Sequence, residues 1–248
     1  MAETEPVRRR RGLTTFGVKL IGGSLVLLST LSAVILRHLA GQSSAAAAPM
    51  GPLTLAIVGS VLSWAGIPIY AWLVAEGFRH TRSLGRYAAA LLAVGLVSEI
   101  PYDLVGSGRA IDWSSQNPAL ALPICLAVLY FMDKAVQGRP KPAAAALCTV
   151  VVLAGIVWVL ALRIGTQFGL MNLGVFMVAL LPVFRFLRKR ENIMVMAGAA
   201  VCALPLAIPA FGLIPVHLAN GELGYRQPWT KWAFYVFYPA HLLLFALV

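Results

Sequence analysis

Charged residues are scarce in this chain. Only 12% of its 248 residues are Asp, Glu, Lys or Arg, whereas 60% are hydrophobic. Soluble domains of ordinary composition are about a quarter charged and about half apolar. A surface this poor in charge suits lipid better than water. The composition therefore excludes a soluble globular protein and predicts one helical bundle in a membrane.

Acidic residues and cysteines are scarcer still. Nine acidic residues stand against 20 basic ones, which leaves a net charge of +11. The basic residues fall in short clusters between apolar runs, as is typical of membrane topology, and we therefore expect no nucleic-acid partner. The three cysteines, Cys125, Cys148 and Cys202, lie inside apolar runs and lack CxxC spacing. They predict neither a disulfide framework nor a metal site.

Eight apolar runs are long enough, or nearly so, for a membrane span, which takes about 20 helical residues. They occupy residues 16–39, 53–75, 86–101, 117–132, 143–162, 170–187, 193–214 and 231–248. These runs predict an all-α, polytopic integral membrane protein with about eight transmembrane helices. We expect a basic N-terminal tail at residues 1–15 and a single transmembrane helical domain at residues 16–248. Its first helix is expected to be retained rather than cleaved as a signal peptide.

The basic residues also predict an orientation. If the tail that holds Arg8 to Arg11 is cytoplasmic, fifteen of the 20 basic residues fall on that side of the membrane. The five on the other side are Arg37, Arg109, Arg163, Arg226 and Lys231. Cytoplasmic loops of membrane proteins carry an excess of Lys and Arg. The alternation therefore predicts that both termini are cytoplasmic.

Ionisable residues within apolar runs are costly in lipid and usually face a cavity or a partner. Glu76 and His80 are four residues apart, so they share one face of a helix. They form either a general-base pair, in which the carboxylate orients the imidazole, or an ion pair that ends the span.

A second polar stretch lies near residue 100. Glu99 and Asp103 are also four residues apart, and Pro101 between them disrupts helical hydrogen bonding. Either the two carboxylates bind a cation, share a proton or receive an amine or hydroxyl, or they belong to a solvated helix end. Asn117 precedes Pro118 at the start of the next run, where helix capping is the simpler interpretation.

A third polar stretch begins at Lys231. His241 follows ten residues later, about 15 Å along a helix, which places it near the bilayer midplane. Tyr238 lies three residues before His241 and on roughly the same side of the helix. His241 is either a structural residue or, because of its depth in the membrane, a functional one.

At these three stretches the sequence resembles the TraX family of multi-pass membrane proteins. The matching residues are GIPIYAWLVAEGFRHT at 66–81, SEIPYDL at 98–104 and KWAFYVFYPAHL at 231–242. Their order and their positions at helix ends also match. The resemblance covers residues 20–248, which is most of the chain.

The resemblance implies an activity. The family's named activity is N-acetylation of the N-terminal amine of pilin subunits, and the family is similar to other membrane acyltransferases. It therefore implies acetyl-CoA as the acyl donor, without a metal, and an acceptor amine or hydroxyl on a protein, glycan or lipid of the cell envelope. It also implies a place in the bacterial cytoplasmic (inner) membrane, with the lipid bilayer and other membrane proteins as partners.

The resemblance further implies roles for the matched residues. The catalytic set, with a histidine as base, would be His241, His80 and Glu76. The polar residues that bind the acceptor would be Glu99, Asp103, Lys231, Tyr238 and Asn117. The arginines that attract the phosphates of coenzyme A, unless they serve topology alone, would be Arg79, Arg82 and Arg86.

The sequence departs from the family pattern in two places. Family members carry an Asp-His pair in the first helix, where this chain has Ser29 and Thr30, with Arg37 and His38 about two turns further on. A later acidic position is occupied by Gln167. These departures leave two other classes open. The chain is then a non-catalytic accessory subunit that binds no coenzyme A or, given its broken helices and intramembrane carboxylates, a small transporter.

Overall fold

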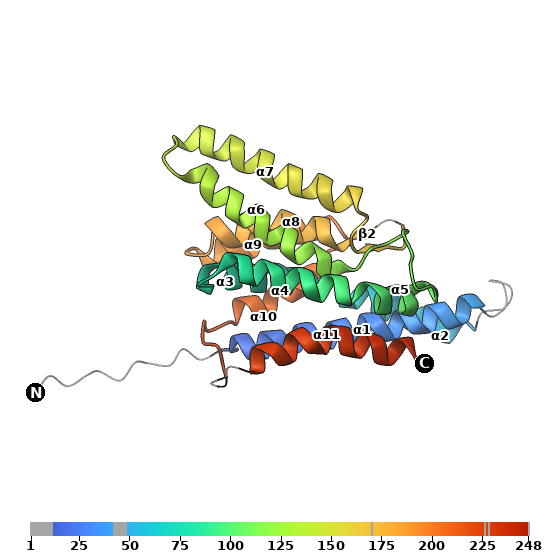
Figure 1. Cartoon of the computed structure of the whole chain (residues 1–248). Coiled ribbons are helices and arrows are strands. Elements are labelled where there is room, and N and C mark those ends of the chain that lie inside the picture. Colours follow the sequence, from blue (N-terminus) through green and yellow to red (C-terminus); the bar gives the residue numbers. More distant parts are fainter. Residues whose placement is uncertain (1–11, 42–48, 170, 226, 228, 248) are drawn as a thin grey trace, which may run out of the picture.

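The computed structural model describes residues 12–247, apart from residues 42–48, 170, 226 and 228 (Figure 1). Helices dominate this part of the chain. Their bounds are α1 Thr15–Gly41, α2 Met50–Ser63, α3 Gly66–His80, α4 Leu84–Val97, α5 Glu99–Ser107, η2 Pro118–Leu120, α6 Ala121–Val136, α7 Lys141–Ala161, α8 Leu173–Phe186, α9 Glu191–Ala203, η3 Ile208–Gly212, α10 Leu213–His217 and α11 Thr230–Ala246.

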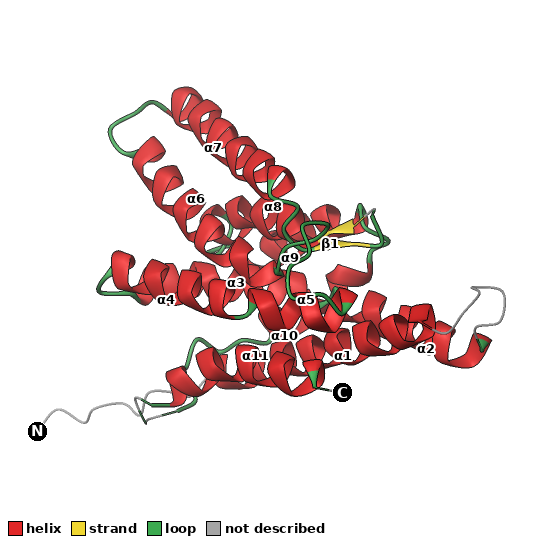
Figure 2. Ribbon diagram, turned by 45° about the vertical axis from the view of Figure 1, so that its right-hand side comes forward, coloured by secondary structure: helices red, strands yellow, loops and turns green. Residues whose placement is uncertain are grey.

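Among the described residues, five helical stretches are long and apolar enough to cross a membrane. They are α1, the joined α2 and α3, the joined α4 and α5, the joined η2 and α6, and α7. Shorter apolar helices occupy the remaining runs. The prediction of a helical protein with several helices that could span a membrane is therefore confirmed. The exceptions to an all-α fold are β1 (Thr166–Gln167) and β2 (Met171–Asn172), which form a two-residue antiparallel ladder (Figure 2).

The break that Pro101 predicts comes three residues earlier. α4 ends at Val97 and α5 begins at Glu99, with Ser98 between them. Pro101 is then the third residue of α5, where a backbone N–H has no partner within the helix and its loss is tolerated. Glu99 and Asp103 thus lie on a short helix that is separate from α4.

Several contacts join segments at one end of the bundle. We call it the basic end because most clusters of Lys and Arg lie there. The Arg188 guanidinium, just after α8, lies 3.1 Å from the Glu76 carboxylate near the end of α3. Leu13, just before α1, accepts a backbone hydrogen bond from Asn220 at 2.8 Å. At the opposite end, the loop after α5 pairs with the turn after α7 through a bridge between Gln116 and Ile164.

Helices α1 and α11 run side by side in the same direction (Figure 1). Phe16 and Phe234, near the start of each helix, have ring centroids 5.7 Å apart. Val34 and Leu242, further along each helix, belong to one small buried cluster. The described ends of the chain therefore lie at opposite ends of the bundle. The prediction that both termini lie on one side of the membrane is therefore not confirmed.

The difference from the expected arrangement arises at the predicted span 193–214. α9 ends at Ala203, and the positive φ angles of Leu206 and Ala207 turn the chain back. η3 and α10 then return toward the basic end, where His217 Nδ1 lies 3.1 Å from Glu191 Oε1 at the start of α9. Hydropathy does not distinguish a re-entrant hairpin from a membrane span, because both bury the same kinds of residue.

This hairpin moves the following segment to the basic end. Residues 218–225, predicted to lie opposite the N-terminal tail, are instead hydrogen bonded to the start of α1. Lys231, at the start of α11, moves with them. Arg226 and the tail that holds Arg8 to Arg11 lie outside the described residues. Among the described residues, most Lys and Arg therefore lie at the basic end, and Arg37, Arg109 and Arg163 lie near the opposite end.

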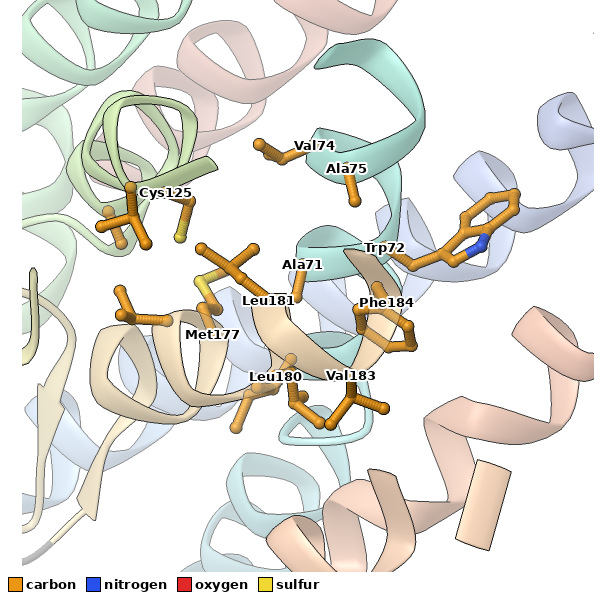
Figure 3. Packing of buried hydrophobic residues seen from close by; sticks show 14 of the residues in the cluster. Ala71, Trp72, Val74, Ala75, Cys125, Met177, Leu180, Leu181, Val183 and Phe184 are labelled. Carbon is orange, nitrogen blue, oxygen red and sulfur yellow. The ribbon is translucent and has the colours of Figure 1, made fainter. Parts of the chain in front are cut away.

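The largest buried cluster lies where α3, α6 and α8 meet (Figure 3). Ala71, Cys125 and Leu181 are buried there, one from each helix. α7 packs close to this layer at Gly155, where an added Cβ would lie 2.5 Å from Val128 Cγ2. Small residues allow such close approach, which drives helix association in lipid. All three cysteines are buried and unpaired with one another, as their apolar surroundings predict.

Candidate functional site

A cavity of about 1510 Å³ extends through the bundle from the basic end to the opposite end. α1, α3, α4, α5 and α11 all contribute to its wall. At the basic end the lining includes Lys19, Glu76, His80, Arg82 and Arg86. Toward the opposite end it includes Thr30, Tyr238, Asp103, Ser115 and Gln167. One chamber thus connects residues from all three polar stretches.

Glu76 is the centre of an ion-pair cluster at the basic mouth. Its carboxylate lies 2.9 Å from Arg79, 3.1 Å from Arg188 and 3.5 Å from His80. The Glu76 side chain is 13% exposed and that of His80 is 69% exposed. Glu76 and His80 do share one face, as their spacing predicts. Because two arginines also bind Glu76, the cluster ties α3 to the segment after α8, a contact that their spacing did not predict.

The three predicted phosphate-binding arginines differ in their surroundings. Arg79 is engaged by Glu76. Arg82 and Arg86 are exposed, line the cavity, and make no ion pair within the part of the chain that the structure describes. Lys19 lies nearby in the cavity wall, with its ammonium over the rings of Tyr225 and Phe234. The basic mouth therefore offers two guanidinium groups to an anion.

Asp103 lines the opposite part of the chamber and has one carboxylate oxygen without a partner. Its Oδ2 accepts the backbone N–H of Asp112 at 2.8 Å. Its Oδ1 is buried and has no hydrogen-bond partner within the described residues. The residue is only 4% exposed and lines the cavity. A buried acceptor that lacks a partner is free to receive a hydrogen bond from a ligand.

Asp112 holds the loop at this end in place. Its Oδ1 accepts the backbone N–H of Ser114 at 2.9 Å. This hydrogen bond to the charged form lowers the pKa of Asp112 below its ordinary value. The carboxylate therefore remains ionised at neutral pH, and its loop keeps the backbone N–H that binds Asp103.

Asn117 joins four parts of the bundle and is completely buried. Its Oδ1 accepts both the Tyr238 hydroxyl at 2.6 Å and the Ala119 N–H at 2.9 Å. Its Nδ2 donates to the Gly95 carbonyl at 3.3 Å, and its backbone N–H lies 3.2 Å from a Glu99 oxygen. The predicted capping of η2 is confirmed. The contact with Tyr238 on α11 is the additional feature that only the folded chain reveals.

His241 lies beside Thr30 rather than beside Glu76 and His80. Its Nε2 is 3.1 Å from Thr30 Oγ1, and its Nδ1 is 2.9 Å from the Phe237 carbonyl. The imidazole stacks on Phe237 at a centroid distance of 5.0 Å and meets Tyr238 edge-on. His241 and Thr30 are both buried, and Thr30 is one of the residues that line the cavity.

The predicted catalytic residues therefore separate into two groups. Glu76 and His80 lie at the basic mouth. Thr30 is eleven residues beyond Lys19 on α1, about 16 Å further along the helix axis. His241 contacts Thr30 and therefore lies at a similar distance from the basic mouth. The side chain of Lys231 lies outside the described part of the structure.

Thr30 and Gln167, at the positions where the sequence departs from the family pattern, both contact side chains that are distant in the sequence. Thr30 contacts His241, as described above. Gln167 Oε1 accepts the Trp64 indole N–H at 2.6 Å, which links the β1–β2 hairpin to the end of α2. Sequence comparison marks these positions as departures, yet the contacts made there are long-range and become visible only in the folded chain.

Comparison with known families supports the resemblance seen in the three polar stretches. The family model described as TraX protein matches residues 31–248. Comparisons with curated proteins and with solved structures yield no match. The matched region begins just after Thr30 and contains all three polar stretches and most of the chamber wall, but not Lys19 or Thr30. The chain belongs to the TraX family.

Proposed function

We propose that this protein is a membrane-embedded acyltransferase that moves an acetyl group from acetyl-CoA to an amine or hydroxyl of an envelope acceptor. The observation that carries the proposal is the single chamber joining a basic mouth to a buried acidic residue at the other end. Transfer across a membrane needs a donor site, a reacting centre and an acceptor site within one connected space.

The basic mouth suits the donor. Arg82 and Arg86 line the chamber entrance and are free of acidic partners among the described residues. Guanidinium groups bind phosphate oxygens through charge-assisted hydrogen bonds. Coenzyme A carries its phosphates at one end and the acyl thioester at the other. Anchoring the phosphates at the mouth lets the thioester enter the chamber.

The deeper part of the chamber suits the acceptor. Asp103 offers an unpartnered buried oxygen to a donor N–H or O–H. Tyr238 lines the wall nearby and is held by Asn117. His241, one turn further along α11, supplies the imidazole that acts as base. His80 is farther from this region and lies within the donor mouth.

The charge distribution supports a cytoplasmic basic end. On this proposal the chain crosses the bacterial inner membrane as α1, joined α2 and α3, joined α4 and α5, α6, α7, α8 and α11. The α9–η3–α10 hairpin enters the membrane and returns. The N-terminus is then cytoplasmic and the C-terminus lies on the outer side, with Lys and Arg concentrated inside.

Acetyl-CoA binding and acyl transfer test the proposal directly. The full chain, reconstituted in lipid nanodiscs, is titrated with acetyl-CoA by calorimetry. Acceptor-dependent release of coenzyme A is then followed with a thiol reagent, using a short peptide with a free N-terminal amine and a soluble glycan as acceptors. Binding followed by thiol release supports the proposal. An accessory subunit would bind no acetyl-CoA, and a transporter would move a labelled solute without breaking the thioester.

A further inference from the structure

We propose that Thr30 is a nucleophile that carries the acyl group between donor and acceptor, with His241 as its base. This inference rests on the proposed acyltransferase function and adds a covalent intermediate to it. It assigns a reacting atom to a position where the chain departs from its family, and it makes Thr30 and His241 one catalytic unit.

The position of Thr30 is the first argument. Thr30, 5% exposed, is among the residues that line the chamber, and His241, 6% exposed, is buried next to it. The Thr30 hydroxyl oxygen is 3.1 Å from His241 Nε2. Within the described chain, it is the one chamber-lining hydroxyl that contacts a histidine nitrogen. The chamber wall therefore contains a hydroxyl group with a histidine nitrogen beside it.

The groups around His241 and Thr30 determine which atom carries each proton. The Phe237 carbonyl has no hydrogen, so the neutral imidazole carries its proton on Nδ1 and donates it there. Nε2 then has a lone pair, and the Thr30 hydroxyl donates its one hydrogen to Nε2 in place of the Val26 carbonyl. A nucleophilic hydroxyl, a base within hydrogen-bond reach and a third group that orients the base form the arrangement used by activated serine and threonine nucleophiles.

The pair also accommodates the protonated imidazole. When Nε2 carries a hydrogen, it donates to Thr30 Oγ1. The threonine hydroxyl then has a second acceptor in the Val26 carbonyl, 3.0 Å away. The stacked ring of Phe237 and the edge contact of Tyr238 hold the imidazole in one orientation. Both protonation states of His241 therefore have complete hydrogen-bond partners, as a group that takes and returns a proton requires.

The reaction has two balanced steps. In the first, Thr30 Oγ1 attacks the thioester carbonyl while His241 Nε2 takes the hydroxyl proton. The carbon–sulfur bond breaks, and coenzyme A leaves as the thiol after receiving that proton. In the second, the acceptor amine or hydroxyl attacks the threonine ester and gives its proton to His241. The ester bond breaks, and the proton returns to Thr30, which restores the starting state.

The test is the covalent intermediate itself. The reconstituted full chain is incubated with acetyl-CoA in the absence of an acceptor, quenched, and measured by intact mass and peptide mapping. We expect a mass increase of one acetyl group on the peptide that contains Thr30. We also expect release of one equivalent of coenzyme A per protein, and loss of the adduct when the peptide acceptor is added.

Matched variants locate the chemistry. Thr30→Val keeps the side-chain shape and removes the hydroxyl, so no adduct should form. Thr30→Ser keeps the hydroxyl and should retain the adduct. His241→Phe preserves stacking on Phe237 but removes the base, and should slow adduct formation by at least a hundredfold. Thr149→Val is the control, because Thr149 bonds to the carbonyl four residues earlier, as Thr30 does, but lies on α7 away from the chamber.

The outcomes separate this inference from the proposed function. Acetyl transfer to the acceptor with no adduct on wild type, or with full transfer by Thr30→Val, overturns the nucleophile and leaves the acyltransferase standing. An adduct on another residue also overturns it. Absence of both acetyl-CoA binding and thiol release overturns the acyltransferase proposal and this inference together. Correct folding of each variant is checked by its retained acetyl-CoA affinity.

Discussion

Asn220 donates its backbone N–H to the carbonyl oxygen of Leu13 at 2.8 Å, and Leu13 donates in turn to Leu218 at 2.7 Å. These hydrogen bonds join the start of α1 to the segment before α11. They place both segments on one side of the bundle, together with the ends of α3 and α8. The topology of the whole chain follows from this contact, because α11 then runs parallel to α1.

Thiol labelling checks this topology. Single cysteines are placed at Glu222, in the segment before α11, at Gln137, between α6 and α7, and at Ser114, after α5. All three positions are exposed, and the native cysteines are buried. With a membrane-impermeant maleimide in spheroplasts, we expect Ser114→Cys to react at once. Glu222→Cys and Gln137→Cys should react only after the membrane is opened. Co-labelling of positions 222 and 114 would contradict the re-entrant hairpin.

Removing the two free guanidinium groups should weaken donor binding. The double variant Arg82→Ala/Arg86→Ala is expected to raise the Kd for acetyl-CoA at least tenfold, since hydrogen bonds to charged groups contribute about 1.5–3 kcal/mol and each 1.4 kcal/mol is a factor of ten. Calorimetry at low and high salt measures the Kd, and the affinity of the wild type for acetyl-CoA should fall as the salt concentration rises. Arg139→Ala is the control, because Arg139 binds the Lys134 carbonyl away from the chamber. An equal loss of affinity in Arg139→Ala would indicate that the protein's overall positive charge attracts acetyl-CoA, and would contradict a specific binding site at Arg82 and Arg86.

Asn117 should contribute more to stability than its partner Tyr238. Tyr238→Phe removes one hydrogen bond and leaves Asn117 Oδ1 bound to Ala119, so we expect a loss of about 0.5–1.5 kcal/mol. Asn117→Ala leaves the partly buried Tyr238 hydroxyl without its partner and opens a void at a fully buried position. We expect a loss of about 2–4 kcal/mol. Denaturation in mixed micelles measures both free energies of unfolding, and the reverse order would refute the central role of Asn117.

The re-entrant hairpin depends on Gly212. A Cβ at this position would overlap the backbone carbonyl of Ala65 and lie 2.7 Å from Pro68 Cγ. Because this backbone carbonyl lies in the short turn between α2 and α3 and moves little, Gly212→Ala should lower the free energy of unfolding by about 1–3 kcal/mol. Gly85→Ala is the matched control, since nothing lies within 4 Å of its Cβ. Thermal unfolding in detergent should show a lower midpoint for the first variant alone.

Much of the fold could be predicted from apolar runs. α1 and α7 lie within two residues of the runs that predict them, because the free energy of transfer to lipid sums over local sequence. The run 193–214 misled, since a turn at Leu206 and Ala207 leaves hydropathy unchanged. The positions of Pro205 and Pro209 on either side of that turn were the available signal, and proline is disfavoured inside a helix.

The candidate site could be predicted only in part. Spacing by four residues placed Glu76 and His80 together, because both lie on one helix. The same rule is silent about Arg188, which reaches Glu76 from another part of the chain. Thr30 drew attention only as a departure from its family. Its contact with His241 joins the first and last helices, and no local pattern reports a pairing at that distance.

The sequence alone determined that this is a helical membrane protein of the TraX family, because scarce charge, apolar runs and short polar motifs are local properties. The tertiary structure decided which polar residues meet. It folded the run 193–214 into a hairpin, made α11 parallel to α1, and brought Thr30 of the chamber wall into contact with His241. These outcomes depend on packing between distant helices, where shape and hydrogen bonding select one arrangement from several that satisfy the same hydropathy.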